Sequence, residues 1–291
     1  MRLALRRGVL LLVIAGALSA CTGPGVSLPF SEPAAAVVDG HTISMKAYQA
    51  RLEVSRHRDP FSGIPEAVPS PAPAQRLQTF TIEQLVREEI VRQEAEKRSI
   101  TMSDRALDSR VATLKAQAGA TAFNAALQRN GFTSDSFRSY QRALLTEVGL
   151  LHAMAKDRAD SAAHELNAGQ AFAAVAARWS DDTGTSTRGG DAGWLRTAEI
   201  PEATLATAVA SLPAGSVTGI VSTNRGFTIA TVLERRTDQV HLAIILVLAP
   251  SVDLYSPQGM PAWFTKFIDD RQVGLRRAGR IELKVGNRAS G

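Results

Sequence analysis

The chain has 291 residues, of which 45% are hydrophobic and 21% are charged, and its formal net charge is +5. Its one cysteine excludes an internal disulfide and a cysteine metal cluster, and we expect no metal or other cofactor. Because the sequence shows neither a basic stripe nor an aromatic stacking motif, we also expect no nucleic-acid partner.

The N terminus predicts a secretory signal. Three arginines precede an apolar run from Gly8 to Leu18, which is too short to cross a bilayer as a mature helix. The run ends in Leu18-Ser19-Ala20-Cys21, which resembles the bacterial lipobox. In that motif the cysteine is diacylated and the chain is cut just before it. An ordinary signal peptide with an incidental cysteine and an uncleaved anchor are the alternatives.

The lipobox resemblance implies that residues 1–20 are a signal peptide, that Cys21 is lipidated and that residues 21–35 form a flexible tether. It also implies an extracytoplasmic protein anchored to the cell membrane, or to the outer membrane if the cell has one. The mature chain would keep 271 residues (291 minus 20) and a charge of +2 (30 basic minus 28 acidic residues). That length is enough for one large or two modest domains.

From Ala36 onward the sequence predicts a hairpin followed by helices. Two short apolar runs flank Asp39-Gly40, a hairpin turn signal, and Ser44 is the expected cap of the next helix. Five prolines in residues 59–75 exclude regular structure there and predict a loop or linker. Apolar residues at helical spacing then predict four more helices up to about Asp157. The expected boundaries are Ser103 or Asp104, Asn130-Gly131, and Thr133 or Ser134.

The amino-acid sequence of this region is similar to that of a known family. The similar segments are AAVVDGHTISMKAY, LQTFTIEQLVREEIVRQEAEKRSITMSD and FNAALQRNGFTSDSFRSYQRALLTEVGLL. In order and spacing they resemble the N-terminal chaperone domain of SurA, over residues 36–157. The resemblance implies a helical chaperone module that binds extended segments of unfolded exported proteins as its partners.

Residues 158–250 predict a second domain. An alanine-rich helix leads to the loop SDDTGTSTRGGDAGW (180–194), and LPAGSVTGIVSTNRGFTIATVLERR then supplies a helix end and two strands. Residues 162–236 resemble a parvulin-type (PpiC) peptidyl-prolyl isomerase domain. The resemblance implies an α/β domain with a four-stranded antiparallel sheet and a proline pocket. Such a pocket favours the twisted imide, whose rotation otherwise has a barrier of about 18–20 kcal/mol.

The parvulin resemblance also implies a set of site residues. Asp182 falls on the catalytic Cys/Asp position, whereas the two histidine positions hold Thr228 and Ile244. The substrate-binding candidates are Ile200 (at the Met position), Leu205 (at the Phe position), Trp194, Thr228 and Ile244. The alternatives are that Asp182, like Asp181, is a solvated loop carboxylate and that Trp194 belongs to the core. Asp191 is expected to brace the Gly-Gly turn.

The first strand of a parvulin domain has no room between a helix ending near Asp157 and Ala162. The run QVHLAIILVLAP (239–250) follows the last strand instead and is continuously apolar from Ala243 to Leu248, as a central strand requires. We expect it to fill the empty position as a natural permutation. His241 and Ile244, three residues apart, should then lie on opposite faces.

The C-terminal residues 251–291 predict a helix and a strand. WFTKFIDDRQVGLRRAGRIELKVG resembles the segment that returns to complete the N-terminal module in SurA-like and PrsA-like chains. We expect it to pair with the hairpin at Val37-Val38. The fold class is therefore α+β: a mainly helical SurA-like module, completed by the C-terminal helix and strand, with an inserted parvulin-like domain.

These resemblances imply a membrane-tethered extracytoplasmic chaperone or foldase for unfolded exported proteins, whose parvulin-like domain has weak or lost prolyl isomerase activity. One alternative is an active peptidyl-prolyl cis-trans isomerase that uses Asp182 in an otherwise apolar pocket. Another is an envelope assembly factor with one dedicated partner.

Overall fold

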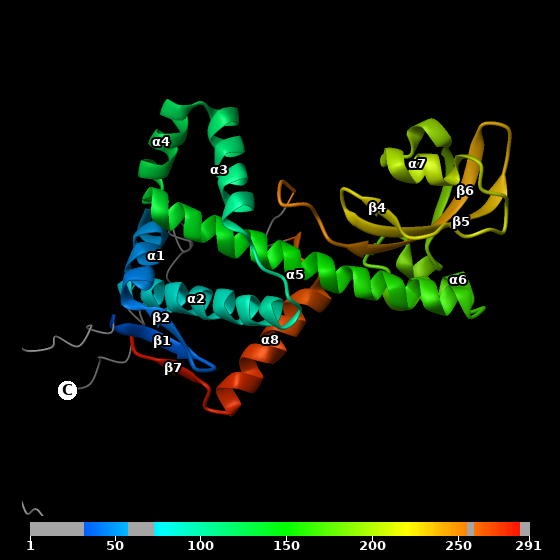
Figure 1. Ribbon diagram of the computed structural model, residues 1–291. Coiled ribbons are helices and arrows are strands. Elements are labelled where there is room, and N and C mark those ends of the chain that lie inside the picture. Colours follow the sequence, from blue (N-terminus) through cyan, green and yellow to red (C-terminus); the bar gives the residue numbers. More distant parts are fainter. Residues whose placement is uncertain (1–31, 58–72, 255–258, 286–291) are drawn as a thin grey trace, which may run out of the picture. The chain divides into compact units, whose positions relative to one another are not determined.

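A computed structural model describes residues 32–57, 73–254 and 259–285 (Figure 1). The expected signal peptide, Cys21 and most of the expected tether lie outside the described residues, as does most of the proline-rich stretch. None of the helices within the described ranges is long and apolar enough to span a membrane.

The first elements form a hairpin followed by a helix. β1 (Ala34–Val38) and β2 (His41–Ser44) flank Asp39 and Gly40, which both adopt a positive φ, as the tight turn requires. α1 (Met45–His57) is capped as expected, because the Ala47 N–H donates to Ser44 Oγ. β1 begins before the expected end of the tether at residue 35, since its first residues are already needed to pair with β2.

The next helices begin and end close to the expected boundaries. They are α2 (Pro73–Lys97), α3 (Asp104–Ala118), α4 (Ala120–Arg129) and α5 (Ser134–Asn167). Ser103 caps α3, and Thr133 forms a capping box with Ser136 at the start of α5. The proline-rich stretch was expected to reach residue 75, but α2 starts at Pro73. Proline is tolerated there because the first helical N–H has no intrahelical partner.

The length of α5 differs from the prediction. A helix end near Asp157 was predicted, but α5 is a single helix of 34 residues that continues to Asn167. Alanine has the highest helix propensity, and the alanines at 155, 159 and 162 are fully buried, so they continue the buried face at helical spacing. α5 therefore packs in two hydrophobic cores, that of the helical module and that of the second domain.

The C-terminal residues return to the N-terminal module, as expected. α8 (Ala262–Arg277) buries Phe264, Ile268 and Leu275 in the same core as α1 and α2. β7 (Ile281–Leu283) pairs antiparallel with β1, which gives a three-stranded sheet in the order β2-β1-β7. Figure 1 shows this as a red strand beside a blue one.

The second domain contains a four-stranded antiparallel sheet in the order β3-β6-β5-β4. Its strands are β3 (Asp191–Arg196), β4 (Val221–Thr223), β5 (Gly226–Arg235) and β6 (Gln239–Leu248). Its helices are α6 (Phe172–Trp179) and α7 (Ala203–Ala210), with short 3₁₀ turns η1 (Ser186–Arg188) and η2 (Thr197–Glu199). β6 lies between β3 and β5, so the prediction that the run 239–250 supplies a central strand is confirmed.

Loss of the packing of α8 should destabilise the helical module. Phe264 is fully buried, so Phe264→Ala should lower the free energy of unfolding by about 3–5 kcal/mol because it leaves a cavity. Val273 lies on the same helix and is 45% exposed, so Val273→Ala should change stability by no more than about 0.5 kcal/mol. Urea unfolding monitored by circular dichroism measures both variants. Equal, small losses would contradict the packing of α8 into this core.

Candidate functional site

A small apolar cavity lies against the sheet of the second domain. Its volume is about 120 Å³, and its lining comes from β3, the turn before α7, α7 itself, β4 and the turn after it, β5 and β6. Four of the candidate residues share this lining: Ile200, Leu205, Thr228 and Ile244. Three of them are more than nine-tenths buried, and Ile244 is partly buried. The structure thus brings together the residues at both expected histidine positions and the two expected apolar positions.

Asp182 does not line this cavity. One oxygen of its carboxylate, Oδ2, accepts a hydrogen bond of 2.8 Å from the Thr185 hydroxyl, and its backbone carbonyl accepts from the N–H groups of Thr185 and Ser186. Aspartate commonly stabilises a turn in this way, by bonding to residues just after it. The contacts therefore give Asp182 a structural part in its own loop.

Asp181 is not a solvated carboxylate, contrary to the alternative considered for this loop. Its Oδ2 accepts hydrogen bonds of 2.9 Å from the Leu248 N–H and from the Trp263 indole Nε1. Burial raises the pKa of the Asp181 carboxyl, and the two hydrogen bonds and the charge of Arg158 oppose that shift. Asp181 thus ties the signature loop both to the end of β6 and to α8.

An arginine between two tryptophans lies next to Asp181. The Arg158 guanidinium lies 4.7 Å from the ring centroid of Trp263 and 5.1 Å from that of Trp179. These are cation–π distances, and burial lowers the pKa of Arg158. The sequence did not predict this arrangement, because the three side chains come from α5, α6 and α8.

The Gly-Gly-Asp turn is built against the central strand. Gly190 has φ +85°, and a Cβ on it would lie 2.5 Å from the Ile244 carbonyl oxygen, so only glycine fits. Asp191 Oδ1 accepts a 2.8 Å hydrogen bond from the Gly193 N–H, as expected for a brace. The same oxygen lies 2.8 Å from His241 Nε2. The Gly193 N–H and His241 lower the pKa of Asp191.

Trp194 lies apart from the cavity. Its ring stacks on His241 with 5.2 Å between ring centroids, and the Arg236 guanidinium lies 3.9 Å from its centroid. His241 and Ile244 take opposite faces of β6, as the strand period predicted, and only Ile244 lines the cavity. A role in substrate binding stays a prediction for every candidate residue.

Comparisons with known proteins cover most of the chain. Residues 4–150 match the SurA-like N-terminal domain, and this match spans just over half of the 291 residues. The chain belongs to the SurA-like family. Residues 149–234 match the rotamase family, the PPIC-type PPIASE domain, so this SurA-like chaperone contains a parvulin-type domain. That match ends before β6 begins at Gln239, which leaves the central strand outside the matched residues.

Solved structures of PrsA are distant neighbours of this SurA-like chain. PrsA from Bacillus cereus is 15% identical, with 84% of each chain covered and a TM-score of 0.24. The foldase protein PrsA from Streptococcus pneumoniae is 14% identical, with 86% of each chain covered and a TM-score of 0.26. PrsA from Bacillus subtilis is 18% identical, with 73% of this chain and 83% of that chain covered and a TM-score of 0.24. TM-scores this low carry no argument about this chain. No curated protein matches the sequence closely.

The two carboxylates on either side of the loop should respond to pH in opposite directions. The pKa of Asp181 is raised in the folded state, so wild type should lose stability relative to Asp181→Asn as pH rises through about 3.9 and above. The pKa of Asp191 is lowered, so wild type should gain stability relative to Asp191→Asn above about pH 3.9 and lose that advantage as pH falls below it.

Thermal unfolding of both variants and wild type between pH 3 and pH 7 measures the two differences. Asparagine keeps an acceptor oxygen at either position, so the variants report chiefly on charge. Slopes of the same sign would contradict the opposite environments of the two side chains.

Proposed function

We propose that this protein is a membrane-tethered extracytoplasmic foldase that binds unfolded exported polypeptides, and that its parvulin-type domain has weak or lost isomerase activity. The observation that carries the second part is the composition of the 120 Å³ cavity. Threonine and isoleucine occupy the expected histidine positions there, and the Asp182 carboxylate is bonded to Thr185 outside it. The cavity retains an apolar surface for a proline ring.

Client binding is supported by an aromatic hollow in the helical module. A cavity of about 460 Å³ between α3, α4 and α5 is lined by Phe123, Phe132, Phe137 and Tyr140. Phe137 packs edge-on against both other phenylalanines with ring centroids 5.5 Å apart. None of the four rings is fully buried, and an incompletely covered aromatic surface of this kind is typical of sites that receive apolar segments of another chain.

The membrane tether is proposed from the lipobox at Cys21 alone. Lipidation would keep the described domains on the extracytoplasmic side of the membrane, where exported polypeptides emerge unfolded. A cysteine that carries two or more acyl chains anchors a protein stably in a membrane, whereas a single acyl chain gives only reversible membrane binding.

An isomerase assay tests the activity proposed for the pocket. With a proline peptide in a protease-coupled assay, wild type should give little rate gain over the uncatalysed reaction, and Asp182→Ala should match wild type because Asp182 does not line the cavity. A clear rate gain that is lost in Asp182→Ala would instead support the alternative, an active prolyl isomerase that depends on this carboxylate.

Suppression of aggregation tests client binding. The protein should slow the light scattering of a chemically denatured exported protein on dilution, and Phe137→Ala should weaken this effect because Phe137 contacts two other rings of the hollow. Val273→Ala, on the exposed side of α8, is the matched control. Failure of wild type with unrelated unfolded clients would favour an assembly factor with one dedicated partner.

A further inference from the structure

The edge of the three-stranded sheet has an open side. In the order β2-β1-β7, β2 has a strand neighbour on one side only among the described residues. An edge strand presents unpaired N–H and C=O groups that can accept another strand. β2 is short, and three of its four residues are exposed or only partly buried. It therefore offers a place where another extended chain could pair.

The register shows which backbone groups of β2 point outward. Val38 pairs with His41 across the two-residue turn, and Val37 pairs with Thr42. The Asp39 N–H donates to the Arg280 carbonyl, and the Ala35 carbonyl accepts from the Lys284 N–H. The backbone N–H and C=O groups of the odd-numbered residues of β1 therefore point toward β7. Bonded and non-bonded pairs alternate in an antiparallel ladder. The N–H and C=O of Thr42 consequently point away from β1.

A groove runs beside these outward-pointing groups of Thr42. Its volume is about 380 Å³, and its lining includes Thr42, Ile43 and Ser44 of β2 together with residues of α1, α2 and α5. Ile43, Ala47, Leu85 and Ala143 give it an apolar base. Side chains that alternate along an added strand could therefore enter the groove at every second position.

The charged residues of the groove are already paired. Glu88 forms an ion pair with Arg51, and Arg142 donates to the Met102 carbonyl and to Asp104. Arg92 binds Glu89 through two nitrogens and also contacts Glu96. A groove whose charges are compensated in this way favours an uncharged occupant, because a charged side chain would enter without a partner.

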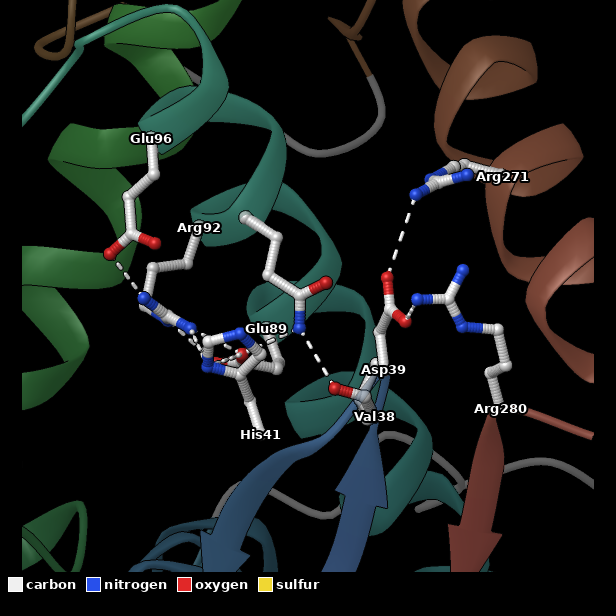
Figure 2. A network of polar contacts seen from close by, with 9 residues as sticks. Val38, Asp39, His41, Glu89, Arg92, Glu96, Arg271 and Arg280 are labelled. Atoms are coloured by element: carbon white, nitrogen blue, oxygen red, sulfur yellow. Dashed lines mark hydrogen bonds and ion pairs between the residues drawn. The ribbon is translucent and has the colours of Figure 1, made fainter.

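The hairpin that carries the edge is fixed in place. Figure 2 shows Asp39 between Arg271 and Arg280, with which it forms ion pairs, and His41 against Arg92. Gln93 donates a 2.9 Å hydrogen bond to the Val38 carbonyl. A preorganised edge pays less conformational entropy when a strand is added to it.

We propose that an extended, uncharged segment of an unfolded client adds to β2 beside Thr42 and places alternate side chains in this groove. Only a polypeptide backbone supplies both a donor and an acceptor at strand spacing to the outward groups of Thr42. The inference rests on the proposed binding of unfolded polypeptides and adds a second binding place, which shares no lining residue with the aromatic hollow, and a mode of binding by strand pairing.

A proline substitution removes the outward donor and leaves the β1–β2 pairs intact. Proline is tolerated on an edge strand whose N–H faces outward. Thr42→Pro should weaken binding of a fluorescein-labelled twelve-residue peptide of alternating valine and threonine about tenfold, measured by fluorescence anisotropy. Thr42→Val keeps the N–H and the β-branched shape, so its affinity should equal that of wild type.

Two further binding experiments test the inference if Thr42→Pro does not fold. The same peptide with alternate amides N-methylated should bind wild type about tenfold more weakly, because it cannot complete the pairing. Ala143→Leu should fill the groove and weaken binding, whereas Ala143→Ser should not.

Equal affinity of the methylated and unmethylated peptides for wild type would overturn the inference. If wild type suppresses aggregation but these variants bind like wild type, only the site on β2 is wrong. If wild type binds no unfolded polypeptide, both the inference and the proposed function fail. A concentration-dependent dimer that Thr42→Pro abolishes in size-exclusion chromatography would identify a second copy as the occupant and would also overturn the inference.

Discussion

The uninterrupted helix α5 constrains the rest of the chain. It leaves the helical module and enters the core of the second domain without a break, so no strand can form ahead of the parvulin-type loop. The central position of the sheet must then be filled from the other end of the domain, and β6 fills it. Because β6 leads on to α8, the strand that completes the second domain directly precedes the helix that completes the first. Asp181 joins these two segments by accepting from both Leu248 and Trp263.

This arrangement also bears on the chemistry of the pocket. A pocket for prolyl isomerisation must hold the proline ring and favour the imide as it loses resonance. The apolar part of the lining would meet the first requirement, with Ile244 from β6 and Ile200 and Leu205 from the region of α7. The polar residues that line it are Glu202, Thr223, Arg225 and Thr228. The two aspartates of the loop lie outside the lining: Asp182 stabilises its own turn, and Asp191 braces the Gly-Gly turn and contacts His241. This lining is the basis for our proposal that the domain holds a proline segment with little or no isomerase activity.

Much of the fold could be predicted from the sequence because its signals are local. Ser44, Ser103 and Thr133 cap helices where their side chains predict, and the apolar run in β6 marks a strand buried on both faces. The continuation of α5 past Asp157 was missed because its buried face there consists of small alanine side chains, which stand out less in a sequence than large apolar residues. The partial burial of Asp181 could not be predicted, since its partner Trp263 lies 82 residues away in sequence. Asp182 lies outside the cavity and stabilises the four-residue turn from Asp182 to Thr185, a local arrangement that a family alignment alone does not resolve.

The central claim is that the parvulin-type pocket can hold a proline segment without accelerating its isomerisation. Two-dimensional exchange NMR on a short proline peptide tests it directly, because uncatalysed exchange takes tens to hundreds of seconds. With substoichiometric protein and sub-second mixing times, the account predicts peptide line broadening from binding but no cross-peaks between the cis and trans resonances. Cis–trans cross-peaks at those mixing times would show catalysed exchange and would contradict the account.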